Sequence, residues 1–436
     1  MKILILGSGG REHAFCWKIS QSKLCTQLFI APGNAGTAQL GENIQIDMND
    51  FNAVKKICVS KNIDMVVVGP EEPLVRGIYD FFKKDEDLKS IVITGPSASG
   101  ARLEGSKAFA KSFLQRHQIP TAAYREFEVA NFNEGLEYIQ HHPLPIVLKA
   151  DGLAAGKGVI ICNSHMEALS EFEMMIQQSK FGDAGKKVVV EEFLDGIELS
   201  VFALTDGKNY VLLPEAKDYK KIGEGDKGLN TGGMGAISPV PFATEHFIKK
   251  VIERIIEPTI KGLREEKIDY KGFIFFGLIK VDEEPVVIEY NCRMGDPETE
   301  VVLLRLKNDL VPLFIAMDQQ KLDQYKTVFD EKNAATIVAV SGGYPEEYEK
   351  GLPIDFGYLE NPEAIKHIDE DGGVMVFHAG TMKVNGAVTT NGGRVLAVSA
   401  LADGLGDAIE LAKTILEEIY FEGMYYRGDI GYEFID

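Results

Sequence analysis

The chain has 436 residues, enough for about three domains at roughly 150 residues each. Apolar residues make up 45% and charged residues 26%, an ordinary balance that excludes a wholly disordered chain. The formal net charge of −20 disfavours general nucleic-acid binding, because an acidic surface repels phosphate backbones, but it allows local basic sites for small phosphorylated ligands.

The first hundred residues alternate short apolar runs with longer amphipathic runs. Strands are predicted over residues 2–6, 28–30, 65–68 and 91–94, and helices over 12–20, 51–61 and 74–83. This alternation predicts an α/β domain with a mostly parallel sheet, and the switch point of such a sheet usually binds a ligand.

The rest of the chain mixes strands and helices less regularly. A predicted helix over about 103–117 is followed by strands over 146–149, 159–162, 188–192 and 199–204, a helix near 167–178, and a hairpin of 273–281 with 286–291. A later region carries predicted strands over 335–340, 374–378 and 394–399 and a helix over 407–420. We therefore predict a multidomain α/β and α+β chain, with a parallel-sheet domain over 1–103, a middle region over 104–326 and a small mixed α/β domain over 327–436.

A glycine-rich loop joins the first predicted strand to the first predicted helix. The N–H groups of Gly9 and Gly10 can face an anion there, assisted by the helix N-terminus. A dinucleotide fold would place a third glycine where this chain has Glu12, and no acidic residue ends a second strand about twenty residues on, so NAD binding is disfavoured. Binding of a phosphorylated small molecule is the preferred interpretation, and a simple tight turn is the alternative.

The most phosphate-like segment is KADGLAAGKG, residues 149–158. It resembles a Walker loop only superficially, because Gly158 replaces the Ser or Thr that would hold Mg²⁺. A strand is predicted directly after it, whereas a P-loop needs a helix there. We expect a glycine-rich flap that closes over a nucleotide triphosphate, with Lys149 and Lys157 as point charges. A solvated hairpin with two surface lysines is the alternative.

The sharpest signal is VIEYNCRMGDPE, residues 287–298. Glu289 and Asn291 are two apart on a predicted strand, so both side chains project from one face. A carboxylate and an amide oxygen together suit a hard cation that carries substrate phosphates, which predicts Mg²⁺. Arg293 shares that face if the strand continues, where it would clamp a carboxylate or phosphate, whereas Cys292 should point to the opposite face. An internal salt bridge is the alternative.

Three further polar segments are weaker signals. Glu71 and Glu72 follow a predicted parallel strand, at the edge where such sheets bind ligands. The segment 191–198 follows a buried strand, so its backbone could pair with an adenine edge and Glu198 could accept the ribose hydroxyls. Residues 218–235 form a long glycine-dense loop, and loops of that length are usually functional or disordered. Its apolar end favours an ordered loop.

Cysteine use and hydropathy indicate a cytoplasmic protein. The five cysteines are widely spaced and include no CxxC pair, so neither a disulfide framework nor a structural zinc site is expected. The N-terminal apolar run is short and unlike a signal peptide, and no apolar stretch reaches the ~18 residues of a membrane span.

Taken in order, these segments resemble the phosphoribosylamine–glycine ligase (glycinamide ribonucleotide synthetase) family of the ATP-grasp superfamily. The motifs that carry the resemblance are GSGGREHA, APGNAGTA, GPEEPL, LEGSKAFAK, LKADGLAAGKGV, EEFLDGIELS, LNTGGMGAISP, EYNCRMGDPETE, HAGT and TNGGRVLA. They extend from residue 7 to beyond residue 390, so the resemblance covers nearly the whole chain. One departure stands out: the family usually reads Asp-His-Lys-Arg where this chain has Asp218-Tyr219-Lys220-Lys221.

The resemblance implies an N-terminal pre-ATP-grasp α/β domain, an ATP-grasp pair with a flap subdomain at about 121–190, and a small C-terminal domain. It implies an ATP-dependent carbon–nitrogen ligase that joins glycine to 5-phospho-β-D-ribosylamine through a glycyl phosphate. The products would be glycinamide ribonucleotide, ADP and phosphate, in the second step of de novo purine synthesis. The cofactor would be Mg²⁺ or Mn²⁺, with ATP as co-substrate. We expect small-molecule partners only, with no nucleic acid and no membrane, and a monomer.

The resemblance also implies roles for individual residues. ATP would be bound by Lys107, Lys149, Gly156, Lys157, Gly158, Glu191, Phe193, Leu194 and Glu198. The metal would be held by Glu289 and Asn291. Glycine and phosphoribosylamine would be bound by Gly9, Gly10, Glu71, Asp218, Arg293, Gly295, Asp296 and Pro297. The catalytic residues would be Arg293, Asp218 and Lys149.

Two other functions stay open on the sequence. One is another ATP-grasp carboxylate–amine ligase of purine metabolism, and the other is a non-catalytic nucleotide sensor on that scaffold. The joint presence of Lys149, Glu289, Asn291 and Arg293 argues against the sensor, since a degenerate protein has no reason to keep the metal pair. An NAD-dependent dehydrogenase is disfavoured by Glu12.

Overall fold

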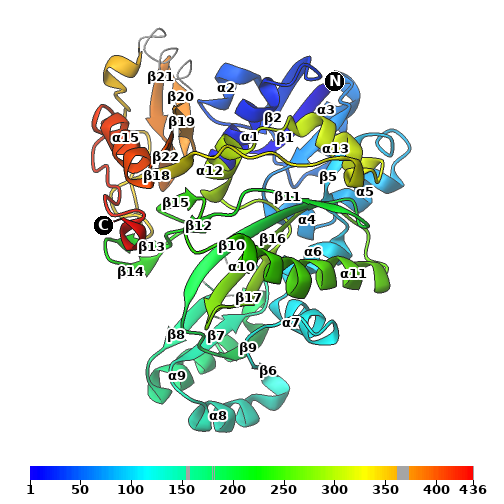
Figure 1. Cartoon of the computed structure of the whole chain (residues 1–436), viewed down its shortest axis with the longest axis vertical. Helices are drawn as coiled ribbons and strands as arrows, with labels where there is room; N and C mark the ends of the chain where they lie inside the picture. The colour runs from blue at the N-terminus through cyan, green and yellow to red at the C-terminus, as the bar shows by residue number, and fades with distance from the viewer. Residues whose placement is uncertain (154–157, 179, 181, 361–372, 436) are drawn as a thin grey trace.

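The computed structural model describes residues 1–153, 158–178, 180, 182–360 and 373–435. The described strands form a nine-stranded sheet, a five-stranded sheet, a four-stranded sheet and two small hairpins. Figure 1 shows the four-stranded sheet projecting at the bottom of the view, with the N-terminal and C-terminal parts side by side at the top. No helix in these described ranges is long and apolar enough to cross a bilayer.

The N-terminal region contains the predicted parallel sheet. Its strands are β1 (Lys2–Gly7), β2 (Gln27–Pro32), β3 (Glu42–Asn43), β4 (Met65–Val68) and β5 (Val92–Pro96). Its helices are α1 (Gly10–Ser20), α2 (Thr37–Leu40), α3 (Phe51–Lys61), α4 (Glu71–Val75) and α5 (Ile78–Lys84). The five strands are parallel, in the order β5-β4-β1-β2-β3, so the expected strand–helix alternation is confirmed.

Two segments that were each predicted to form one continuous helix form two helices instead. The helix predicted over 74–83 is divided into α4 and α5 at Gly77, whose φ of +85° is open to glycine without strain. The helix predicted over 103–117 is divided into α6 (Ala98–Gly105) and α7 (Lys107–Arg116). The side chain of Ser106 accepts a hydrogen bond from the N–H of Phe109 (3.1 Å) and so caps α7.

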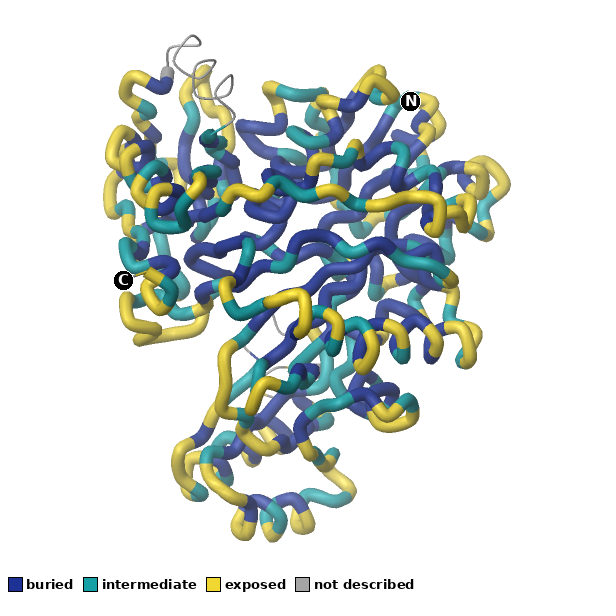
Figure 2. Tube along the Cα trace, viewed as in Figure 1, coloured by how far each residue is buried: buried dark blue, intermediate teal, exposed yellow. Residues whose placement is uncertain are grey.

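Alternate residues of the central strands enter two different cores. Leu4 and Leu6 pack on one face of the sheet, and Ile3 and Ile5 pack on the other. A sheet that is buried on both faces reads as a continuous apolar run, as β1 and β4 do. Figure 2 shows these strands as a buried interior beneath more exposed peripheral segments.

The middle region extends the same sheet with antiparallel strands. Its strands are β10 (Ile197–Thr205), β11 (Tyr210–Leu212), β16 (Tyr270–Val281) and β17 (Glu284–Asn291). β16 pairs with β5, β10 and β17, which confirms the predicted hairpin and joins the two regions into one sheet. The helices that follow or flank these strands are α10 (Glu245–Val251), the π-helical turn η3 (Ile252–Ile256), α11 (Glu257–Glu265), α12 (Glu298–Arg305) and α13 (Leu310–Asp318).

The four-stranded sheet forms a separate lobe. Its strands, in spatial order, are β6 (Tyr124–Glu128), β9 (Lys187–Glu192), β7 (Ile146–Ala150) and β8 (Val159–Cys162). The helices α8 (Phe132–His141) and α9 (His165–Ile176) pack with it around Phe127 and Phe172. This small core is independent of the others, so the lobe can be considered a unit in its own right.

The C-terminal sheet contains two strands from the middle of the chain, β12 and β15. Its strands, in spatial order, are β12 (Lys217–Asp218), β15 (Gly235–Ser238), β18 (Asn333–Val340), β22 (Arg394–Ala402) and β19 (Val374–His378). The helix α15 (Leu405–Glu417) covers it. The hairpins are β13 (Lys221–Gly223) with β14 (Lys227–Asn230), and β20 (Thr381–Val384) with β21 (Ala387–Thr390). The glycine-dense loop at 218–235 is therefore anchored to this sheet at both ends.

Candidate active site

The predicted metal pair lies at the end of β17. Glu289 and Asn291 are half-buried, whereas Tyr290 between them is buried on the opposite face, where it bonds Thr259. Within the part of the chain that the structure describes, the side chains of Glu289 and Asn291 make no hydrogen bond or ion pair with another residue. No cluster of three or more His, Cys, Asp or Glu side chains among the described residues could hold a metal ion by itself. The pair therefore fits a cation such as Mg²⁺, which takes most of its ligands from water and substrate phosphates.

Two buried lysines share one carboxylate beside this pair. Glu191 on β9 lies 3.0 Å from Lys149 on β7 and 2.9 Å from Lys111 on α7, measured from Oε2 to each Nζ. Lys149 also donates to the carbonyl of Ile288, next to Glu289 (3.2 Å). Burial lowers the pKa of Lys111 to about 8, although Glu191 acts in the opposite direction. The lobe and α7 together thus place two lysines and one carboxylate beside the metal pair, an excess of positive charge such as a phosphate site requires.

A third lysine joins the lobe to the start of α7. Lys107 donates from Nζ to the carbonyl of Gly152 (2.9 Å), at the beginning of the predicted flap loop. Burial lowers the pKa of Lys107, and the Glu289 carboxylate acts against this. Asp151 accepts from the N–H of Ala108 (3.1 Å), which ties the loop to the first turn of the helix.

The loop after β7 connects two antiparallel strands. The N–H of Ala150 donates to the carbonyl of buried Gly158 (2.8 Å), and Lys149 pairs with Val159 across the hairpin. The predicted strand–loop–strand arrangement is confirmed, and it is incompatible with a P-loop. Gly156 and Lys157 lie outside the described residues.

The link from the lobe to the main sheet runs from β9 to β10. Phe193 is exposed and Leu194 half-buried in this link, and the side chain of Glu191 before it is turned to the lysines. Glu198, at the start of β10, accepts from Nζ of Lys220 (2.5 Å). The link therefore places a carboxylate close to the glycine-dense loop.

A group of three charged side chains lies where the glycine-dense loop begins. It consists of Glu198, Lys220 and Asp218. Lys220 lies 4.0 Å from Asp218 in addition to its contact with Glu198. Burial raises the pKa of Asp218, while Lys220 holds the pKa of Glu198 below its usual value. Burial disfavours charge on Lys220, but the carboxylates of Asp218, Glu198 and Glu289 together raise its pKa well above normal. Because the Glu289 carboxylate acts on the pKa of both Asp218 and Lys220, these two side chains lie close enough to the predicted metal pair to interact with it electrostatically.

The glycine-rich loop holds a buried glutamate where a dinucleotide fold has glycine. Glu12 accepts from the N–H of Gly9 (2.6 Å) and from Nε of Arg11 (2.7 Å). A Cβ at Gly7 or Gly69 would lie 2.5 Å or 2.0 Å from the Glu12 side chain, so these glycines provide the space that it fills. The carboxylate at this position is thus part of the packing between α1 and the ends of β1 and β4.

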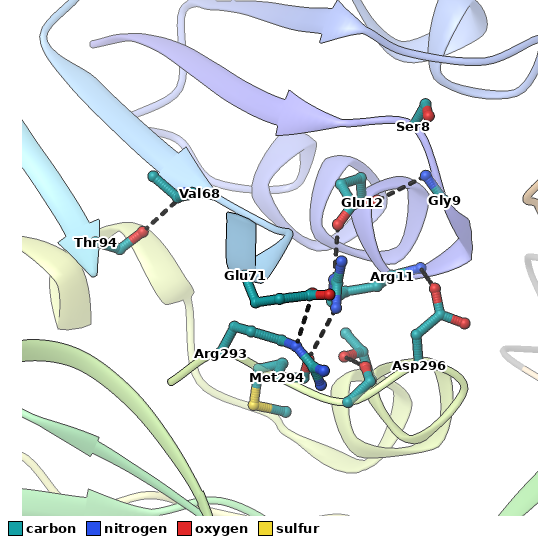
Figure 3. A network of polar contacts seen from close by, with 12 residues as sticks. Ser8, Gly9, Arg11, Glu12, Val68, Glu71, Thr94, Arg293, Met294 and Asp296 are labelled. Atoms are coloured by element: carbon teal, nitrogen blue, oxygen red, sulfur yellow. Dashed lines mark hydrogen bonds and ion pairs between the residues drawn. The ribbon is translucent and has the colours of Figure 1, made fainter. Parts of the chain in front are cut away.

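Arg293 lies beyond the end of β17, so the condition for a shared face with Asn291, a strand that continues to Arg293, is not met. Its guanidinium contacts Glu104 (2.9 Å) and Glu71 (3.4 Å), which is the internal salt bridge considered as the alternative. Burial opposes charge on Glu71, but Arg293 and Arg11 lower its pKa. Figure 3 shows Glu71, Arg293 and the Arg11–Glu12 pair converging below the glycine-rich loop.

Cys292 donates from both its N–H (2.8 Å) and Sγ (3.1 Å) to Glu104. Its side chain is buried in the same core as Tyr290, so the expected orientation away from the metal face is confirmed. Burial raises the pKa of this thiol well above normal. An inert, buried thiol is no candidate nucleophile.

Asp296 connects the glycine-rich loop to the C-terminal sheet. It accepts from the N–H of Arg11 (3.3 Å) at the start of α1 and pairs with Arg394 of β22 (3.0 Å). A carboxylate therefore occupies the helix terminus at which the sequence predicted an anion, beside Gly9 and Gly10. Its neighbours Gly295 and Pro297 pack against Glu298 and Gly233 respectively.

Two functional candidates were missed by sequence reasoning. Glu298 is 4% exposed, accepts from Ser200 (3.2 Å), and has a pKa that burial and Asp218 raise to about 7. Lys111 shares Glu191 with Lys149. Each residue lies within a motif quoted above, Glu298 in GDPETE and Lys111 in SKAFAK. A charged residue in such a motif is as easily explained by a place on the surface, so the motif alone did not indicate a functional role.

This fold and this site define an ATP-dependent ligase of the ATP-grasp class. A biotin carboxylase domain of the Hydrogenobacter thermophilus 2-oxoglutarate carboxylase shares the fold, with a TM-score of 0.72 and 16% identity over 97% of this chain and 91% of that one. The crystal structure of phosphoribosylamine–glycine ligase from Thermotoga maritima matches with a TM-score of 0.84 and 33% identity over 98% of this chain and 100% of that one.

The chain belongs to the phosphoribosylglycinamide synthetase family. The family models match in order, with the N domain over residues 1–104, the ATP-grasp (A) domain over 105–299 and the C domain over 334–433. The phosphoribosylamine–glycine ligase of Clostridium acetobutylicum is 45% identical over 99% of this chain and 99% of its own length. That of Escherichia coli K12 is 44% identical over 100% and 99% respectively.

Proposed function

We propose that the chain ligates glycine to 5-phospho-β-D-ribosylamine at the expense of ATP, giving glycinamide ribonucleotide, ADP and phosphate. The observation that carries the proposal is the set of charged groups around the end of β17: Lys149 donates to the carbonyl of Ile288, and the Glu289 carboxylate influences the pKa of Lys107, Asp218 and Lys220. Among the described residues, the side chains of Glu289 and Asn291 make no hydrogen bond or ion pair with another residue. Membership of the family, whose relatives carry this activity in their names, supports the choice of substrates.

A carboxylate is inert to amines, so glycine must first be activated. Transfer of the γ-phosphoryl group to its carboxylate makes an acyl phosphate, which the sugar amine then attacks. Such a reaction depends mainly on positioning and on charge around the transferring group. Lys149 and Lys107, with Lys157 and Gly156–Gly158 of the flap, would bind the phosphates, and Phe193, Leu194 and the backbone of Glu191 would bind adenine.

The metal would be Mg²⁺ or Mn²⁺, held by Glu289 and Asn291. Bound there, it would neutralise charge on the phosphates. Glu198 would accept hydrogen bonds from the ribose hydroxyls. Its carboxylate lies at the edge of the site, where it accepts a hydrogen bond from Lys220.

Glycine would be placed by Asp218 and Arg293, and phosphoribosylamine by Gly9, Gly10, Glu71 and the Gly295–Pro297 turn. Arg293 would have to exchange part of its contact with Glu71 for substrate, because both side chains are paired with each other. The flap would keep water from the acyl phosphate, which water would otherwise hydrolyse.

The same proposal covers the organisation of the chain. We assign residues 1–103 to a pre-ATP-grasp domain, 104–326 to the ATP-grasp region and 327–436 to a C-terminal domain. The five cysteines are all unpaired, which supports a cytoplasmic location. A monomer is proposed, and sedimentation equilibrium would test it.

The deciding experiment is an assay of ADP release with Mg²⁺-ATP, glycine and freshly made phosphoribosylamine, omitting one component at a time. Release that needs all three supports the ligase. Release with formate or bicarbonate in place of glycine would identify another ligase of the class. Tight ATP binding without any release would identify a nucleotide sensor.

A further inference from the structure

We propose that a short C-terminal segment, residues 427–433, positions Asp218 and Lys220 for catalysis through Tyr219. We call this segment the C-terminal clasp. In Figure 1 it lies near the C-terminus, beside the β13–β14 hairpin. The inference rests on the proposed function, because it assumes that Asp218 and Lys220 act on substrate.

The strand β12 divides its side chains between two surfaces. β12 itself covers only Lys217 and Asp218, and contacts show how the division continues. Tyr219 joins Lys217 at Glu433, whereas Lys220 lies beside Asp218 and Glu198. The backbone of Tyr219 continues the pairing with β15, since its N–H donates to the carbonyl of Gly235 (3.0 Å) and its carbonyl accepts from Met234 (2.7 Å). Any shift of Tyr219 would therefore be transmitted to both neighbours.

The side chain of Tyr219 is fixed by the clasp. It is 1% exposed, and its hydroxyl donates to the Glu433 carboxylate (2.9 Å). The other oxygen of Glu433 pairs with Lys217 (2.7 Å), whose ammonium lies 3.9 Å from the centre of the Tyr219 ring. A closed set of three side chains thus joins the chain end to the strand that carries Asp218.

A second set of contacts holds the hairpin that follows. Arg427 is fully buried and pairs with both Asp226 (2.7 Å) and Asp429 (2.7 Å). Asp429 accepts from the N–H of Gly225 (2.7 Å), and Arg427 donates to the carbonyl of Lys221 (3.1 Å). The clasp therefore fixes both β12 and the β13–β14 hairpin, which together flank Lys220.

This arrangement explains the departure at Tyr219. The side chain points away from Asp218, toward the C-terminal part of the molecule, so the ring is an anchor rather than a group that touches substrate. A tyrosine hydroxyl bound to a carboxylate is a charge-assisted contact, and burial of the tyrosine followed by Glu433 raises the pKa of Tyr219.

The test compares Tyr219→Phe and Glu433→Gln with wild type and with the control Tyr79→Phe. Tyr79 is an equally buried tyrosine that donates to Asp269 (2.8 Å), so its variant loses the same kind of bond elsewhere. We expect KM for glycine to rise about tenfold in both clasp variants, the effect of one lost hydrogen bond to a charged group, while KM for ATP stays within about twofold. The double variant should be no worse than about Glu433→Gln alone, because that variant already weakens the contact that Tyr219→Phe removes, together with the pair to Lys217.

A second readout does not depend on turnover. Hydrogen exchange of the amides between residues 219 and 234 should accelerate in both clasp variants and stay unchanged in Tyr79→Phe. Unchanged exchange and unchanged KM for glycine in a folded Glu433→Gln variant would overturn the inference. Failure of the wild type to release ADP would instead overturn the proposed function, and altered exchange would then still support the clasp.

Discussion

The two halves of the candidate site are built on different kinds of backbone. The nucleotide half rests on strands β7, β9 and β17, whereas the half assigned to phosphoribosylamine rests on the starts of α1 and α4 and on the turn after β17. On a strand, alternation alone determines which side chains share a face. Beyond the end of a strand, alternation no longer determines where a side chain points. Arg293 lies beyond the end of β17, and its guanidinium contacts Glu71 and Glu104.

The halves also differ in charge. In the nucleotide half, two lysines share the single carboxylate of Glu191, which leaves positive charge for an anionic ligand. In the other half, each arginine already has carboxylate partners, and Asp296 occupies the start of α1. In the first half an anion meets more lysines than carboxylates, whereas in the second it must compete with carboxylates that already pair with each arginine.

The largest expected effect concerns the strand-borne metal pair. Glu289→Gln should lower kcat by about 10³-fold, because it removes the carboxylate of that pair without changing its size. The control is Glu284→Gln on the same strand, whose side chain forms a surface ion pair with Lys250 (2.7 Å). Steady-state ADP release, with circular dichroism to check the fold, measures both. Near-normal turnover in Glu289→Gln would place the metal elsewhere.

The next effect tests the surplus of positive charge. Lys149→Ala should raise KM for ATP by about 10–100-fold, equivalent to roughly 1.4–2.8 kcal/mol of binding. Lys187→Ala is the control, because that lysine lies on the neighbouring strand β9 and pairs only loosely with Glu126 (3.5 Å). Equal KM values for the two variants would mean that the phosphates bind away from β7.

The sequence predicted the first half better than the second for a physical reason. The placement of Glu289 and Asn291 follows from their spacing, and so does the inward-facing Cys292. The ion pairs of Arg293 join residues 71, 104 and 293, and such long-range partners cannot be derived from local periodicity. The break at Ser106 and the packing of Glu12 against Gly7 and Gly69 likewise depend on neighbours distant in the chain.

A smaller effect concerns the buried carboxyl of Glu298. Its pKa is raised to about 7 in the folded protein, chiefly by burial, so the folded state binds a proton that the unfolded state releases between about pH 4.5 and 7. This group should therefore lower the free energy of unfolding by roughly 3 kcal/mol as pH rises through that window, and Glu298→Gln should reduce the total fall by that amount. Urea unfolding at pH 5 and pH 8 measures it, with the exposed variant Glu410→Gln as control for the loss of one charge. The same pH slope in Glu298→Gln would assign it to another group.

The smallest expected effect tests whether the start of helix α7, in addition to the strands, positions the nucleotide half of the site. Ser106→Ala removes the cap of α7, and Ser164→Ala removes the equivalent cap of α9, where Ser164 accepts from Glu167 (3.2 Å). Each should cost about 1 kcal/mol of unfolding free energy. Only Ser106→Ala should also raise KM for ATP, by about two- to threefold, because Lys107 begins the helix that the cap holds. If both variants left KM alone, Lys107 would be positioned by its bond to Gly152 and not by the helix start, and the nucleotide half would depend on strands and their loops alone.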